Sequence, residues 1–261
     1  MIYYPFDIQG NAGAGYIPPE KPLEWALQYP TYPVASFELP TLLRWYPVGF
    51  TEKNGVFSVA MPVAAEPEKS VLINSETGKW IGKTIPLFIR KYPFSLHYED
   101  VGEGNVKRSL LIADGAQEHL SFDTPRKILD DEGNPTRLCT NMIKRMARYD
   151  SCRTRDTNIC RLLKSLDVFV PWELNMGPKD NPTVMLNWFR IDEKRLMDLP
   201  GDIVQKLHEH KAWRLIYGHL YSVTCSEAPG RFATLLQKRK TARLEATSSE
   251  HLDDDAGLIE F

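Results

Sequence analysis

The sequence predicts a mixed α+β fold: an antiparallel β-rich N-terminal half made of hairpins, a long central helix and a helical C-terminal part. Two patterns predict it. Short apolar runs separated by turn residues recur as far as residue 113, and apolar side chains then recur at helical spacing over residues 136–166. The chain has 261 residues, of which 43% are hydrophobic and 25% charged, so it is long and apolar enough to bury a core.

Residues 1–33 are rich in Tyr, Pro and Gly. Glycine loses more backbone entropy than other residues when it is fixed in a helix or strand, and proline lacks the backbone N–H that regular structure uses. We therefore expect an irregular arm that packs over the rest of the chain. In residues 34–39, VASFEL, apolar and polar side chains alternate, which predicts a half-buried strand. Asn54 and Gly55 then separate two apolar runs and predict a β-hairpin with a tight turn.

Two further hairpins are predicted, one with strands at residues 71–73 and 80–81 and one that turns at residues 102–105. Between them lies the stretch TGKWIGKTIPLFIRKYPF, which contains a GKT sequence. GKT resembles the end of a phosphate-binding P-loop, but the glycine required five residues before Gly82 is replaced by Thr77. We therefore interpret the stretch as a β-turn followed by a short helical turn that ends at a proline.

The C-terminal part alternates helices with a second pair of strands. The longest helix is predicted over residues 136–166 with one buried stripe, and the strands follow in VFVPWELNM and PTVMLNWFRI. Asp192 and Asp202 are the expected N-caps of two shorter helices. A final core helix is expected to bury Trp213, Ile216, Tyr217 and Leu220, with His219 at the boundary of the core.

Composition divides the chain into four segments. They are an irregular aromatic and proline-rich arm at 1–33, an α+β domain at 34–230, a basic helix at 231–245 and a flexible acidic tail at 246–261.

The overall charge and hydropathy exclude several classes of protein. A net charge of −2 and a pI near 6.3 give no general attraction to nucleic acid, so no nucleic-acid partner is expected. No run is long and apolar enough to span a membrane and no signal peptide is visible, which predicts a soluble, cytoplasmic protein. Four scattered cysteines without a CxxC pair predict free thiols, and no cofactor is expected.

Four segments carry an ordered set of aromatic and proline landmarks. They are YPVASFELPTLLRWYPVGF near the start, GKWIGKTIPLFIRKYPF in the middle, ILDDEGNPT before the long helix, and NWFRIDEKRLMDLPGDIVQKLHEHKAWRLIYGHLYS toward the end. Together they cover residues 30–225 or so, and in this order they resemble the bacterial SapC family. The resemblance implies a link to bacterial surface layers, outer-membrane receptors and halogenase-like flavoproteins, and therefore an accessory or binding role. The family is also described as peptide transporter permeases, which conflicts with the lack of a membrane-spanning segment.

We expect a non-enzymatic protein that binds a partner protein or peptide. Aromatic side chains are compact anchors at interfaces, and the tail DDDAGLIEF combines charges with apolar anchors, as docking segments do. The candidate binding residues are Trp45, Tyr46, Trp80, Tyr92, Phe94, Leu258, Ile259 and Phe261.

Two other patterns carry possible chemistry. His97 and Glu99 would point to one face of a strand, as in a non-haem iron or other metal-dependent oxygenase-like enzyme, which is the alternative function. The run KRMARYDSCRTRD could contact phosphates, but its interleaved Asp150 and Asp156 favour a solvated helix face with local ion pairs. Arg90 and Lys91 of the short helical turn are also expected to face solvent.

Overall fold

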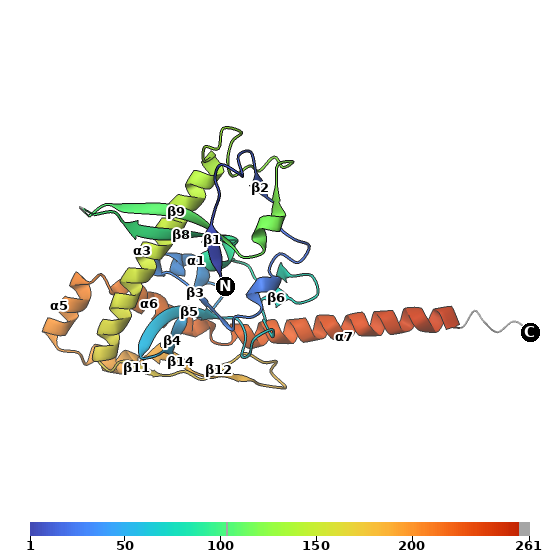
Figure 1. The fold of residues 1–261 in the computed structure, drawn as a ribbon. Coiled ribbons are helices and arrows are strands. Elements are labelled where there is room, and N and C mark those ends of the chain that lie inside the picture. Colours follow the sequence, from blue (N-terminus) through green and yellow to red (C-terminus); the bar gives the residue numbers. More distant parts are fainter. Residues whose placement is uncertain (103, 256–261) are drawn as a thin grey trace, which may run out of the picture.

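Two antiparallel sheets lie against one long helix, α3 (Arg137–Ser165), which crosses the molecule diagonally (Figure 1). The computed structural model describes residues 1–102 and 104–255. One sheet has three strands in the order β1-β9-β8, and the other has five in the order β11-β14-β4-β5-β3. The predicted α+β class is therefore confirmed.

The five-stranded sheet combines the predicted hairpin with one strand that precedes it in the sequence and two that follow α3. Its strands are β11 (Phe169–Pro171), β14 (Trp188–Ile191), β4 (Gly49–Lys53), β5 (Val56–Pro62) and β3 (Thr31–Pro33). Asn54 and Gly55 both have positive φ between β4 and β5, at 52° and 77°, which confirms the hairpin turn. β3 pairs with β5, so the segment expected to be an arm supplies an edge strand.

The three-stranded sheet holds the predicted hairpin β8 (Phe94–Asp100) and β9 (Val106–Ala113), with β1 (Tyr3–Pro5) paired to β9. Three further antiparallel pairs are short. They are β2 (Gly15–Tyr16) with β10 (Leu120–Ser121), β6 (Ile73–Asn74) with β7 (Lys79–Trp80), and β12 (Leu174–Asn175) with β13 (Val184–Met185). The predicted hairpins at residues 71–81 and 94–113 are thus confirmed.

The prediction of a strand at residues 34–39 is wrong. The chain forms a 3-10 turn, η2 (Ser36–Glu38), followed by a short helix, α1 (Leu39–Leu42). The Ser36 N–H donates to Oδ2 of Asp156 at 2.6 Å, and the Ala35 N–H donates to Oε2 of Glu38 at 3.0 Å. Because these backbone donors are used by carboxylates, they are not available to a neighbouring strand.

The predicted long helix is confirmed as α3, which begins after Thr136. The Thr136 hydroxyl accepts the Cys139 N–H at 3.3 Å and caps the helix. The predicted buried stripe is formed by residues that include Met146, Ile159 and Leu163, but it also includes Asp156, which is 1% exposed. A carboxylate inside the stripe is the part of this helix that apolar spacing did not predict.

The C-terminal helices confirm one predicted cap and correct another. Asp192 accepts the Lys194 and Arg195 N–H groups at the start of α4 (Glu193–Met197), as predicted. In α5 (Gly201–Glu209), however, Pro200 occupies the cap position, and Asp202 lies in the first turn. Proline has no side-chain acceptor, and the helix begins with the Ile203 and Val204 N–H groups donating to the Pro200 carbonyl.

The predicted core face of α6 (Trp213–Ser222) is correct in part. Ile216 is buried, and Trp213 and Leu220 are half-buried against the larger core, as predicted, but Tyr217 is 50% exposed. Leu215, His219 and Ser222 are buried in addition. His219 is fully buried because both ring nitrogens are used: Nδ1 lies 2.7 Å from the Val48 carbonyl oxygen, and Nε2 accepts the Ile191 N–H at 3.0 Å. A histidine was expected only at the boundary, so the prediction failed at Tyr217 and underestimated the burial of His219.

The remaining helices are short except for the last. They are η1 (Glu24–Ala26), α2 (Leu87–Arg90), η3 (Ala116–His119), η4 (Val223–Cys225) and α7 (Ala228–Asp255). α7 leaves the body of the molecule and extends away from it (Figure 1). It spans the predicted basic helix and, as far as Asp255, the segment expected to be a flexible tail.

The two sheets build separate cores that α3 joins. The larger core surrounds the five-stranded sheet and takes Ile159, Cys160 and Leu163 from the second half of α3. The smaller core lies under the three-stranded sheet and takes Cys139 and Met146 from the first half. A small cluster of Ala35, Leu87, Tyr149 and Cys152 fills the junction between them.

Candidate functional site

A cavity of about 530 Å³ lies between α2, the start of β8 and the first half of α3. Residues 16–18 and 126–128 complete its wall. Its volume is within the range of sites that hold small molecules or a few residues of a peptide.

Four cationic side chains from three parts of the chain line this basic cavity. Arg90 and Lys91 come from the end of α2, Arg126 from the loop after β10, and Arg145 from α3. Among the lining residues that the structure describes, none is Asp or Glu. The cavity is therefore a region of positive potential in a chain whose net charge is −2.

The three arginines of the cavity are available to a ligand. Arg90, Arg126 and Arg145 are exposed, and within residues 1–102 and 104–255 their guanidinium groups make no ion pair or hydrogen bond. Each guanidinium offers five N–H donors in a planar fork that suits carboxylate and phosphate groups. Arg126 and Arg145 can therefore bind an anion without first breaking an ion pair or hydrogen bond, whereas the charge of Arg90 also acts on the buried Glu38.

Lys91 is the fourth cation and is more enclosed. Its Nζ lies 3.5 Å from the Ser95 hydroxyl and 5.8 Å from the centre of the Tyr149 ring. Burial lowers the pKa of Lys91, and the nearby carboxylate of Asp150 opposes this shift. An anion in the cavity would favour the charged form of this lysine, so binding and protonation support each other.

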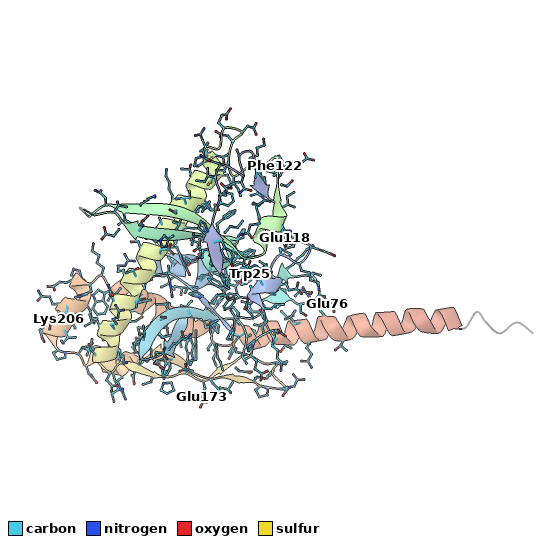
Figure 2. The ribbon with its side chains drawn as sticks, viewed as in Figure 1. Trp25, Glu76, Glu118, Phe122, Glu173 and Lys206 are labelled. Carbon is cyan, nitrogen blue, oxygen red and sulfur yellow. The ribbon has the colours of Figure 1, made fainter. Side chains whose placement is uncertain are left out.

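The remaining lining is aromatic and apolar. Tyr16 packs edge-to-face on Tyr92, with 6.4 Å between ring centres, and on Phe94, with 6.3 Å. Trp25, labelled near the middle of Figure 2, stacks on Tyr92 with its ring centre 4.3 Å away and so supports the cavity wall from behind. Such a surface suits a ligand that joins negative charges to an apolar group.

Glu38 helps to fix the position of α2 and hence of Arg90 and Lys91. Its Oε1 accepts the Leu87 N–H at 2.6 Å, at the N-terminus of α2. Burial raises the pKa of Glu38, whereas its hydrogen bonds from Ala35 and Leu87 favour the carboxylate. The charge of Arg90, at the other end of α2, also favours the Glu38 carboxylate, and Arg90 lines the cavity.

The GKT sequence serves the fold and does not form a phosphate loop. The Thr84 N–H donates to the Tyr46 hydroxyl at 3.1 Å, and a side chain at Gly82 would collide with that hydroxyl. The loop therefore closes around Tyr46, and glycine is required by this close approach. The interpretation as a turn followed by a short helix agrees with α2.

The predicted binding residues separate in space. Tyr92 and Phe94 line the basic cavity. Tyr46 is 2% exposed in the larger core, and Trp80 is half-buried against it at 6.4 Å between ring centres. Trp45 is 40% exposed and does not line the cavity.

The predicted docking residues of the tail, Leu258, Ile259 and Phe261, lie outside the described residues. The structure therefore gives no position for them.

The predicted metal ligands lie on the exposed part of β8. His97 and Glu99 share one face of the strand, as predicted, but Glu99 lies 3.8 Å from Lys107 of the adjacent strand. Within the described part of the chain, no group of three His, Cys, Asp or Glu residues could hold a metal ion. The alternative of a metal-dependent enzyme gains no support from this geometry.

The cavity arginines are the residues that sequence reasoning missed. Arg145 belongs to the basic run on α3, but two other arginines of that run are used internally. Nη1 of Arg153 donates to the Val34 and Val59 carbonyls at 3.1 and 2.7 Å, and Nη2 of Arg155 donates to Ser36 Oγ at 3.1 Å. No spacing in the sequence distinguishes the free arginine from these two.

The fold and site define a mixed α+β protein with a cation-lined cavity that has an aromatic wall. Comparison with known protein families matches the SapC family over residues 15–227, so the chain belongs to the SapC family. The match begins inside the segment expected to be an arm and ends directly before α7. No curated protein and no solved structure matches the chain. None of the described helices combines the length and hydropathy that a membrane crossing needs.

Proposed function

We propose that this SapC-family protein is a binding protein whose basic cavity holds a short acidic segment of a partner protein. The observation that carries the proposal is the convergence of three unpaired arginines on an aromatic wall. Like charges that converge repel one another, and an anionic ligand removes that repulsion.

An acidic peptide segment fits both parts of the lining. Its carboxylates can form paired hydrogen bonds with Arg126 and Arg145, and an apolar side chain can pack on Tyr92 and Phe94. A cavity of about 530 Å³ takes only a few residues, so the partner would contact the protein mainly through this one segment. The resemblance to proteins linked with surface layers and outer-membrane receptors makes proteins of those systems the first partners to test.

The proposal is tested with three synthetic, fluorescein-labelled peptides of about ten residues. All three contain the same central Phe-Leu pair, flanked by Glu in the first, Gln in the second and Lys in the third. We expect fluorescence anisotropy to show at least about tenfold tighter binding of the Glu peptide than of the Gln peptide, because a charge-assisted contact is worth more than 1.4 kcal/mol. Its affinity should fall as salt is raised, since exposed charges are screened.

Two variants show whether the peptide occupies the cavity. In the double variant Arg126→Gln and Arg145→Gln, the Glu peptide should bind about tenfold more weakly or not at all. Lys144→Gln is the matched control, because Lys144 is exposed beside Arg145 on α3 but does not line the cavity. Equal affinity for the Glu and Gln peptides, or equal binding by the double variant and the control, would contradict the proposal.

A further inference from the structure

Resting on the function proposed above, we infer that the basic cavity of one copy binds the acidic segment at residues 253–261 of a second copy of this chain. The inference names one partner for the cavity and predicts self-association.

The segment DDDAGLIEF has the composition that the cavity requires. It contains four acidic residues, Asp253, Asp254, Asp255 and Glu260, and no basic residue. Its three large apolar residues are Leu258, Ile259 and Phe261. The cavity presents four cations, no carboxylate among its described lining residues, and an aromatic wall, so charge and apolar character are complementary.

The other dense acidic run of the chain is already used within the fold. Oδ1 of Asp130 accepts the Asn134 N–H at 2.7 Å, and Oδ1 of Asp131 pairs with the Lys127 ammonium at 2.5 Å. These contacts hold Asp130 and Asp131 within the loop before α3.

α7 carries Asp253, Asp254 and Asp255, the first residues of the acidic segment, away from the body of its own chain. The first turns of α7 are fixed to the body, where Ala233 is buried and Phe232 lies 6.1 Å from Tyr46 between ring centres. The helix then extends clear of the body (Figure 1), and its 28 residues correspond to about 42 Å at about 1.5 Å per residue. A cavity on a second copy is therefore the accessible one.

A contact between cavity and segment joins two different surfaces. Each copy offers one cavity and one segment, so the association is head-to-tail and can continue to a third copy or close into a ring. It depends mainly on charges that are partly exposed, and it should therefore be sensitive to salt.

Sedimentation velocity of the full chain over a range of concentrations tests the inference. The wild-type chain should associate as its concentration rises, and raising salt from about 50 mM to about 500 mM should weaken association about tenfold or more. Two full-length variants should each remain monomeric at concentrations where the wild type associates. The cavity variant carries Arg126→Gln and Arg145→Gln, and the segment variant carries Asp253→Asn, Asp254→Asn, Asp255→Asn and Glu260→Gln.

Mixing the two variants gives the sharpest result. The cavity variant keeps its segment and the segment variant keeps its cavity, so an equimolar mixture should form a one-to-one dimer and nothing larger. Lys144→Gln should associate like the wild type, and circular dichroism of each variant checks that it is folded.

The results separate this inference from the proposed function. A wild-type chain that stays monomeric while the Glu peptide still binds overturns the inference and leaves the proposed function in place. If neither self-association nor peptide binding is observed, both are wrong. Self-association that survives in the folded cavity variant also overturns the inference, because the segment would then dock elsewhere.

Discussion

The two halves of α3 use the same residue types in opposite ways. In the first half, Arg145 faces a cavity and has no partner within the described part of the chain. In the second half, Arg153 donates to two backbone carbonyls, and Asp156 accepts two hydrogen bonds from Ser36. The difference arises because residues 34–36 cross the second half and bring unsatisfied backbone groups to it. Arg153 and Asp156 are thus structural because residues 34–36 cross the helix beside them, whereas Arg145 faces an open cavity.

The crossing point is a compact polar cluster inside the fold. Ser36 donates both its N–H and its hydroxyl to Asp156, at 2.6 and 2.7 Å. Arg155 covers the cluster: its Nη2 lies 3.0 Å from Cys152 Sγ and 3.8 Å from Asp156 Oδ1. A buried carboxylate is tolerated there because its hydrogen-bonding capacity is filled.

The largest loss of stability is expected on substitution of Asp156. Asp156→Ala leaves the Ser36 N–H and hydroxyl unsatisfied and removes the anion beside Arg155, so we expect a loss of about 4 kcal/mol in the free energy of unfolding. Urea denaturation measures it. Asp198→Ala, at an exposed site after α4, is the control and should change stability by less than about 0.5 kcal/mol. Similar stability of the two variants would mean that the cluster does not hold α3 to the loop.

A second internal polar site, at His219, predicts how stability depends on pH. Burial lowers the pKa of His219 to about 4, and the charge of Arg190 adds to this effect, while the hydrogen bond to Val48 opposes it. The folded state thus favours neutral imidazole, so its stabilising contribution is complete above about pH 6.5 and is lost as pH falls toward 4. The loss should reach about 3 kcal/mol at pH 4, from a shift of roughly 2.5 pH units.

Urea denaturation of the wild-type chain and of His219→Gln at several pH values isolates this contribution. The glutamine variant should be less stable at neutral pH but should lose less stability on acidification, because it has no imidazole to protonate. Parallel pH profiles for the two chains would show that other groups cause the acid sensitivity.

The smallest expected loss of stability is at Arg153, and its comparison with Arg145 tests the difference between the two halves of α3 directly. Arg153→Gln should cost about 2 kcal/mol, because the Val34 and Val59 carbonyls lose their shared donor. Arg145→Gln should change stability by no more than about 0.5 kcal/mol, since its side chain holds no internal contact. Equal costs in thermal or urea denaturation would remove the distinction between the two halves.

Local patterns were enough to predict most elements of the fold. The Asn54-Gly55 turn, the helix from Arg137 to Ser165 and the Asp192 cap depend on neighbouring residues, and all three are confirmed. The strand expected at residues 34–39 failed because its backbone donors bond to Asp156, which lies 120 residues away from Ser36. A contact of that separation leaves no periodic signal in the sequence.

The candidate site was only partly predictable for the same reason. Tyr92 and Phe94 were identified by their aromatic character, and both line the cavity. Arg126 and Arg145 meet there only because the loop after β10 and α3 pack together, and the spacing between them in the sequence gives no sign of it. The basic run on α3 was noticed, but which of its members are free depends on the fold.

The packing at the start of α7 affects where the protein can be cut into fragments. The family match ends at residue 227, yet Phe232 packs on Tyr46, Ala233 is buried, and Leu236 packs against the larger core. A fragment designed to end with the family match would expose Tyr46 and its neighbours to water. A fragment that ends after Leu236 keeps the packing of Phe232, Ala233 and Leu236 on the larger core. The end of the family match and the end of a stable recombinant domain therefore differ by about two and a half helical turns.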